Sequence, residues 1–211
     1  MNTTSEPTKQ GHRLTKKGKE TRMRIVAAAA KIIFERGVAG TSVEDVQREA
    51  KVSASQLYHY FKEKRELVLA VIVYQTEQVL GNQEPLLSHL DSVEALRAWR
   101  DAIIKIKTEM NFQGGCPIGS LASELSDNDI EARSELANGF MQWETAIRKG
   151  LRTMSERGEL SEKADPDGLA LALLTALQGG LLLAQVRREI APLREGLDVV
   201  ISYIESLVVK P

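Results

Sequence analysis

The stretch that decides the fold is Thr41–Lys64, which reads TSVEDVQREAKVSASQLYHYFKEK. Two serines in it each precede an acidic or amide residue by three positions, the spacing of a capping box at a helix start. The pairs are Ser42 with Asp45 and Ser53 with Gln56. Only residues 50–52 separate the two expected helices, so these must cross at a steep angle. The stretch predicts a helix-turn-helix whose second helix buries Leu57 and Phe61.

The second helix of this motif carries side chains suited to DNA. Such a helix lies in the major groove, with short polar residues near base edges and phosphate donors at its ends. The candidates for reading bases are Ala54, Ser55 and Gln56, and glutamine can pair bidentately with adenine. The candidates for phosphate contact are Thr41, Ser42, Tyr58, His59, Tyr60 and Lys64. We therefore predict a surface that binds double-stranded DNA.

Two of these residues have competing structural explanations. Gln56 either reads a base or completes the cap begun by Ser53, and the two roles can alternate. Tyr58 is either a phosphate contact or a core residue with a satisfied hydroxyl. The phosphate contact is favoured, because burial next to the lysine stem four residues later would gain little.

Charge is distributed unevenly along the chain. The first 65 residues hold 14 basic and 7 acidic side chains, whereas the remainder holds 14 and 22, which indicates a polyanion-binding front part. Residues 1–19 are polar and rich in lysine, and we interpret them as a flexible basic arm. Such an arm either only keeps the chain soluble or strengthens nonspecific DNA binding. Apolar residues at helical spacing from about Glu20 to Gly37 predict the first helix.

The rest of the chain has helical periodicity. Further helices are expected over about 63–80, 92–111, 117–125, 129–157, 166–188 and 192–209. Pro166 and Pro192 suit the first turn of a helix, and Asp165 is the expected cap of the former. No stretch alternates with a period of two, so we predict an all-α protein with about nine helices. The expected organisation is an arm over 1–19, a helix-turn-helix domain over 20–65 and a ligand-binding and dimerisation domain over 66–211.

These features resemble the TetR family of one-component transcriptional regulators. The resemblance rests on LYHYFKEKREL at residues 57–67, on the preceding TSVEDV and on the apolar first helix, and it is specific over about residues 20–75. It implies that residues 54–60 lie on the recognition helix, with Tyr58, Tyr60 and Lys64 at phosphate positions. The family usually has glycine where Lys51 stands, and a left-handed lysine there costs about 1 kcal/mol.

A pocket for a small-molecule inducer is expected between the helices of the second domain. Its candidate residues are Trp99, Phe112, Cys116, Trp143 and Gln178. Trp143 belongs to an apolar stripe along residues 129–157 that ordinary core packing would also explain. Gln178 is a polar group amid leucines that must find a partner or face a cavity, and a subunit contact is its competing use.

Cys116 is the only cysteine, and it stands between two glycines and Pro117. If Pro117 begins a helix, Cys116 caps it, and the helix field would lower the thiol pKa. The pattern GGCPIGSLASEL resembles a TetR subset in which a cysteine here senses electrophiles or oxidants. Cys116 is thus either an accessible thiolate or a small buried hydrophobe, which is the usual state of a lone cysteine.

The last two helices, over 166–188 and 192–209, form the predicted homodimer interface. The apolar residues expected there are Leu173, Leu177, Leu181, Leu193, Leu197, Val200, Ile204, Leu207 and Val208. Small residues, among them Gly179 and Gly180, would let the helices approach closely. Residues 169–186 are uncharged over about the minimum length of a membrane span. Polar residues interrupt them and subunit burial gives the same composition, so no membrane is expected.

No catalytic, cofactor or metal site is expected. The three histidines lie far apart outside any Glu-x-x-His pattern, and no Gly-x-x-x-x-Gly-Lys run is present. With a single cysteine and no signal peptide, a cytoplasmic location is expected. Our interpretation is a transcriptional repressor that a small-molecule inducer releases from its operator. The open alternatives are a helical small-molecule-binding protein or enzyme without operator binding, and a membrane-associated helical protein.

Overall fold

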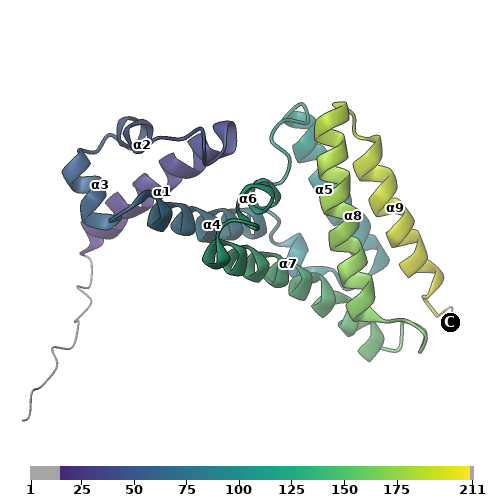
Figure 1. Ribbon diagram of the computed structural model, residues 1–211. Coiled ribbons are helices and arrows are strands. Elements are labelled where there is room, and N and C mark those ends of the chain that lie inside the picture. The colour runs from purple at the N-terminus through teal and green to yellow at the C-terminus, as the bar shows by residue number, and fades with distance from the viewer. Residues whose placement is uncertain (1–14, 210–211) are drawn as a thin grey trace, which may run out of the picture.

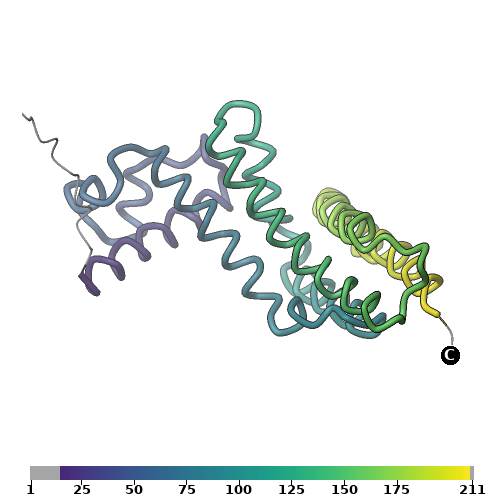
Figure 2. Tube along the Cα trace, turned by 90° about the horizontal axis from the view of Figure 1, so that it is seen from below, coloured from purple at the N-terminus to yellow at the C-terminus, as the bar shows by residue number. Residues whose placement is uncertain are grey.

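The computed structural model describes residues 15–209, and the chain is all-α over this range. The nine α-helices described there are α1 (Lys16–Arg36), α2 (Val43–Ala50), α3 (Ala54–Tyr60), α4 (Lys64–Gly81), α5 (Val93–Glu109), α6 (Pro117–Leu125), α7 (Ile130–Glu156), α8 (Pro166–Arg187) and α9 (Ala191–Ser206). A 3-10 helix that the sequence did not predict, η1 (Leu86–His89), precedes α5. Helices α1–α3 gather at one end of the molecule, and α8 and α9 lie side by side at the other (Figures 1 and 2).

The start of α1 corrects the predicted flexible arm. The Thr15 hydroxyl accepts a hydrogen bond from Gly18 N (3.1 Å), so the helix is capped at Thr15 instead of beginning near Glu20. Residues 16–19 are therefore helical. The rest of the predicted arm, residues 1–14, lies outside the described residues.

The end of α9 also differs from prediction, because the helix stops at Ser206 and not at Val209. Leu207 turns the chain, and Val208 then pairs with Leu160 in an isolated antiparallel β-bridge. The predicted bounds of α6 are confirmed, and so is Asp165 as the cap of α8, since its carboxylate accepts from the Asp167 amide.

One continuous hydrophobic core joins the two ends of the molecule. Leu57 and Phe61 anchor α3 to it, and α4 extends it from α1 to α7. At the far end α9 packs on α8 where Gly180 stands, since a Cβ there would lie only 2.8 Å from the Leu193 Cα. Gly180 thus allows a close approach of α8 and α9 within one chain, whereas the small residues were predicted to serve the interface between subunits. Gly179 faces the other way, with nothing within 4 Å of its would-be Cβ.

Candidate DNA-binding surface and ligand cavity

Both predicted capping boxes are present, and they set the geometry of the helix-turn-helix. Ser42 caps α2 and Ser53 caps α3, each with reciprocal backbone and side-chain hydrogen bonds. Lys51 ends α2 in the left-handed conformation (φ 52°, ψ 51°), as the usual glycine at this position led us to expect. Because Leu57 holds one face of α3 in the core, the opposite face is left on the surface.

Most of the predicted DNA-contacting residues share this exposed face of α3. They are Ala54, Ser55, Gln56, Tyr58 and His59. Tyr58 is 47% exposed, which removes the core explanation of this residue. Tyr60 is only half-buried, and its ring packs edge-on against His59. The Gln56 carboxamide accepts a hydrogen bond from Ser53 N (3.0 Å), so the free protein uses it as a cap.

Thr41 and Lys64 have partners within the protein that the sequence did not indicate. The Thr41 side chain is buried, and its hydroxyl donates to Gly37 O (2.7 Å). This burial takes Thr41 away from the surface on which a phosphate contact was predicted. The Lys64 ammonium donates to Val38 O (2.6 Å), while two further N–H groups of the ammonium stay available. Ser42 is exposed but bonded to Asp45, which places a carboxylate at the α2 N-terminus.

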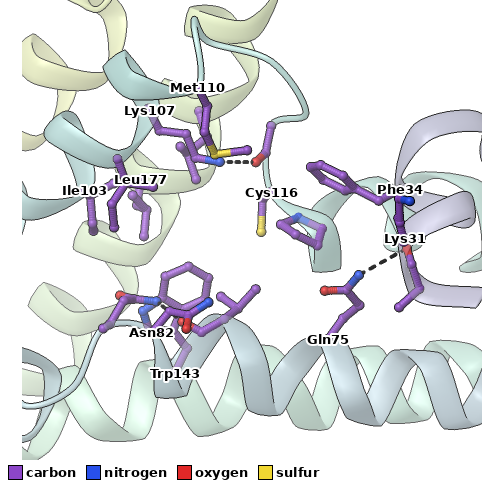
Figure 3. A pocket seen from close by; sticks show the side chains of 17 residues that line it. Lys31, Phe34, Gln75, Asn82, Ile103, Lys107, Met110, Cys116, Trp143 and Leu177 are labelled. Atoms are coloured by element: carbon purple, nitrogen blue, oxygen red, sulfur yellow. Dashed lines mark hydrogen bonds between the residues drawn. The ribbon is translucent and has the colours of Figure 1, made fainter. Parts of the chain in front are cut away.

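A cavity of about 290 Å³ lies where α1 meets α4, α5, α6, α7 and α8. Its lining residues are Ala30, Lys31, Phe34, Gln75, Val79, Asn82, Gln83, Ile103, Ile106, Lys107, Met110, Gly115, Cys116, Pro117, Trp143, Leu177 and Leu181. Lys107, Met110 and Cys116 lie on one side, and Asn82 and Trp143 lie on the opposite side (Figure 3). We call it the junction cavity.

The structure brings two of the five predicted ligand-binding residues, Cys116 and Trp143, into the junction cavity. Trp99 is fully buried behind it, and its indole N–H donates to Gln83 Oε1 (2.8 Å). Phe112 lies in the loop after α5 with a positive φ of 58° and does not line the cavity. Neither Trp99 nor Phe112 lines the junction cavity, and the sequence could not show this, because a burial pattern does not tell which side of an aromatic ring meets an opening.

Gln178 faces a second hollow of about 510 Å³ that Cys116 separates from the junction cavity. Its amide nitrogen is buried and has no hydrogen-bond partner among the described residues. Gln178 was expected to find a partner or to face a cavity, and it lines this hollow together with the exposed Leu182, so a subunit contact stays its competing use. Lys107, Gln75 and Asn82 were missed, because polar residues on amphipathic helices give no sign of which ones border an opening.

Cys116 is the N-cap of α6, as predicted, and its side chain is buried. The sulfur accepts a hydrogen bond from Gly119 N (3.4 Å) and the residue is buried. Burial penalises the thiolate and raises the pKa of Cys116. Desolvation thus outweighs the helix field, and of the two alternatives the structure favours the small buried hydrophobe over the accessible thiolate.

We expect the Cys116 thiol to titrate above the unperturbed pKa of ~8.5 in the folded protein. Its alkylation at neutral pH should therefore be slower than that of the same chain unfolded in urea. The pH dependence of the iodoacetamide reaction measures this, and one cysteine per chain makes the rate specific to Cys116. A folded-state pKa at or below ~8.5 would contradict the burial argument.

The far end of the molecule carries an apolar face that the chain itself does not cover. Its members are Leu171, Leu182, Leu183 and Val186 on α8 and Val199 and Tyr203 on α9, and we call them the α8–α9 face. Val186 is 71% exposed and Leu182 is 60% exposed. By contrast, Leu173, Leu177, Leu181, Leu193, Leu197 and Ile204, which we predicted to contact a second subunit, are buried within one chain.

Over residues 15–209, α8 is the one helix whose length and apolarity would allow it to cross a membrane. Only 44% of its most apolar window is buried inside the chain. No group of three or more His, Cys, Asp or Glu residues placed to hold a metal occurs in the described part. The exposed α3 and the cavity behind α1 define a class, that of helix-turn-helix regulators with a helical second domain.

Comparison with known proteins gives the family. The family model described as tetracyclin repressor-like, C-terminal domain, matches residues 92–200, and the one described as bacterial regulatory proteins, tetR family, matches residues 25–71. The chain belongs to the TetR family of transcriptional regulators.

Individual relatives agree with this assignment. The HTH-type transcriptional repressor DhaR of Mycobacterium sp. strain GP1 is 29% identical over 181 residues, which are 85% of this chain and 89% of DhaR. An HTH-type transcriptional regulator from the lacX 3' region of Lactococcus lactis is 29% identical over 90% of this chain and 95% of its own length. A TetR transcriptional regulator of Chloroflexus aurantiacus J-10-FL superposes with a TM-score of 0.78 at 29% identity, covering 92% of this chain and 98% of that one.

Proposed function

We propose that this regulator is a cytoplasmic repressor that binds operator DNA as a homodimer and leaves it when a small molecule fills the junction cavity. The observation that carries the proposal is that α1 contributes part of the cavity wall. Ala30, Lys31 and Phe34 come from α1, which packs against α2 of the helix-turn-helix, and the other lining residues come from the segment between α4 and α8. A ligand that prefers one position of α1 thereby shifts the population of DNA-competent molecules.

The DNA-binding surface in this proposal is the exposed face of α3. Gln56 leaves its cap to read a base, and Tyr58 and His59 contact phosphates together with Ser42 and Lys64. Two subunits must hold their α3 helices about one turn of DNA, ~34 Å, apart. The proposed border between the DNA-binding part and the ligand-binding part lies near residue 65, in the first turn of α4.

The contacts between these parts support coupling through α6. Its N-terminal residues Cys116 and Pro117 line the junction cavity. At its other end, the Glu124 carboxylate accepts hydrogen bonds from Val38 N (2.8 Å) and Ala39 N (2.7 Å) in the loop before α2. A short helix thus connects the cavity wall to the helix-turn-helix through charge-assisted hydrogen bonds.

A second connection runs from α4 to the start of α7. The Arg65 guanidinium bonds both carboxylate oxygens of Asp129 (2.7 and 2.9 Å) and also pairs with Glu131. The hydrogen bonds from Arg65 lower the pKa of Asp129 to about 2. Since Lys64 bonds Val38 at the same end of α4, this helix is positioned from both sides, which supports its role as the lever between the two parts.

For the homodimer we assign the α8–α9 face as the interface, within the predicted ranges 166–188 and 192–209. Exposed large apolar side chains on adjacent helices are costly in water and are covered when two copies pair isologously. The pairing of α8 and α9 from two subunits would form a four-helix interface. This interface also explains why α8 is long and apolar, because the second subunit and not a membrane covers its exposed side.

Selection of bound fragments from genomic DNA tests the function directly. We expect a short palindromic site, with an affinity that falls steeply as salt rises because lysines and arginines displace counterions from phosphates. Fluorescence anisotropy on the selected fragment at several salt concentrations gives the slope. Binding without sequence preference, or no DNA binding at low salt, would contradict the proposal.

A further inference from the structure

The charged residues of the junction cavity have one sign. Its wall contains two lysines, Lys31 and Lys107, and no aspartate or glutamate. The Lys31 ammonium is already paired with Glu49 of α2 (2.7 Å), on the DNA-binding side of the molecule. Lys107 is therefore the cation in the cavity wall that can pair with a ligand, because no carboxylate of the wall competes for its ammonium.

Lys107 projects from α5 beside the segment that leads into α6. Its ammonium donates one hydrogen bond, to Gly115 O (2.6 Å), and forms no ion pair with any carboxylate of residues 15–209. Burial lowers the pKa of Lys107, because the ammonium is partly desolvated. The neighbouring Cys116 supplies no counter-charge, since burial raises the pKa of its thiol. The site thus favours a ligand that brings a negative charge.

The opposite wall offers a second donor without an acceptor. The Trp143 indole N–H is buried and has no hydrogen-bond partner among the described residues. The Trp143 indole ring also gives this wall an aromatic surface opposite Lys107. Between the two donors the wall is apolar, with Ile103, Met110 and Leu177 prominent in Figure 3.

We infer that the junction cavity binds a small organic acid, whose carboxylate pairs with Lys107 and whose apolar body lies against Trp143 and the aliphatic wall. This inference rests on the proposed function, of which it names the inducer class. The volume of about 290 Å³ lies at the lower end of the range of ~300–1,000 Å³ that small-molecule sites span, so the acid is a small one. Such a ligand also touches α1 and the start of α6, the two elements that support the helix-turn-helix.

Three probes that share one carbon skeleton and are negative, neutral or positive test this inference. Phenylacetate, phenylacetamide and phenethylammonium are titrated into the full-length protein at neutral pH, with hexanoate and hexanamide as a second skeleton. By calorimetry or tryptophan fluorescence, we expect each acid to bind about tenfold or more tightly than its amide, and the ammonium probe to bind least.

Variants then assign the preference to Lys107. Lys107→Met should abolish the difference between acid and amide, whereas Lys107→Arg should keep it. Lys105→Met, which removes an exposed lysine from the same helix, is the matched control and should bind as wild type. If Lys107→Met fails to fold by circular dichroism, Lys107→Gln takes its place beside the arginine variant.

The results that would overturn the inference differ from those that would overturn the proposed function. Equal binding of acid and amide, a preference that survives in Lys107→Met, or no acid binding at millimolar concentration each removes the organic-acid site and leaves operator binding untouched. An acid that binds through Lys107 without releasing selected DNA confirms the site and contradicts the release mechanism. Failure to bind DNA at all contradicts the proposed function alone.

Discussion

Replacing Leu182 and Val186 together by arginine is expected to convert the dimer into folded monomers and to weaken operator binding by about a thousandfold or more. Both side chains lie on the α8–α9 face, and both are more than half exposed in the single chain. A monomer tolerates arginines there, because they meet only water. A dimer would bury four unpaired charges, at a cost of several kcal/mol each.

Sedimentation and anisotropy measure the two effects together. Val73→Arg is the matched control, because Val73 is also a large exposed apolar residue but lies on α4. The Val73→Arg variant should remain dimeric. Leu197→Arg would report on a different property, since Leu197 is fully buried within one chain and its replacement should unfold the protein. A Leu182/Val186 double variant that stays dimeric and keeps its operator affinity would remove the α8–α9 face from the interface.

Ala54→Glu should abolish specific DNA binding without a loss of stability. Ala54 is the first residue of α3 and is exposed on the proposed DNA-binding face. A carboxylate there meets the phosphates of the groove, and like charges brought together cost several kcal/mol, or about a hundredfold in affinity or more. The same carboxylate interacts favourably with the α3 dipole, because the first turn contains no acidic residue.

Ala191→Glu makes the same change at a matched position. Ala191 is the exposed first residue of α9, whose first turn also lacks an acidic residue. Thermal unfolding should show both variants at least as stable as wild type, while DNA binding is lost only in Ala54→Glu. Equal DNA affinity of the two variants would mean that the first turn of α3 does not face the operator.

The features that were predictable from the sequence are those that local chemistry fixes. A capping box needs only a serine and, three residues later, a side chain that accepts a hydrogen bond from the serine's backbone N–H. Because this pattern is local, both helix starts in the motif were predicted. The left-handed conformation of Lys51 was indicated only by the family resemblance, because the family usually has glycine at this position. The position of Cys116 at the start of α6 follows from Pro117 alone.

Features that depend on how helices pack were not predictable in the same way. The sequence of α9 contains one apolar face with Leu193 and Leu197 and another with Val199 and Tyr203, and nothing local tells which one meets α8 of the same chain. The direction of the Cys116 pKa shift could not be predicted for a related reason. The helix field is local, but desolvation depends on what lies over the sulfur. Lys107 stands on an ordinary amphipathic helix, and only the fold places it at an opening.

The contribution of α1 to the junction cavity limits how this regulator can be recombined with its relatives. A chimera that exchanges everything before α4 would also exchange Ala30, Lys31 and Phe34, and with them part of the ligand specificity. The segment that can change operator preference alone is shorter, covering α2, the turn and α3. Sensor design by domain exchange should therefore cut after α1, at the loop that Glu124 holds, and not at the border between the two family domains.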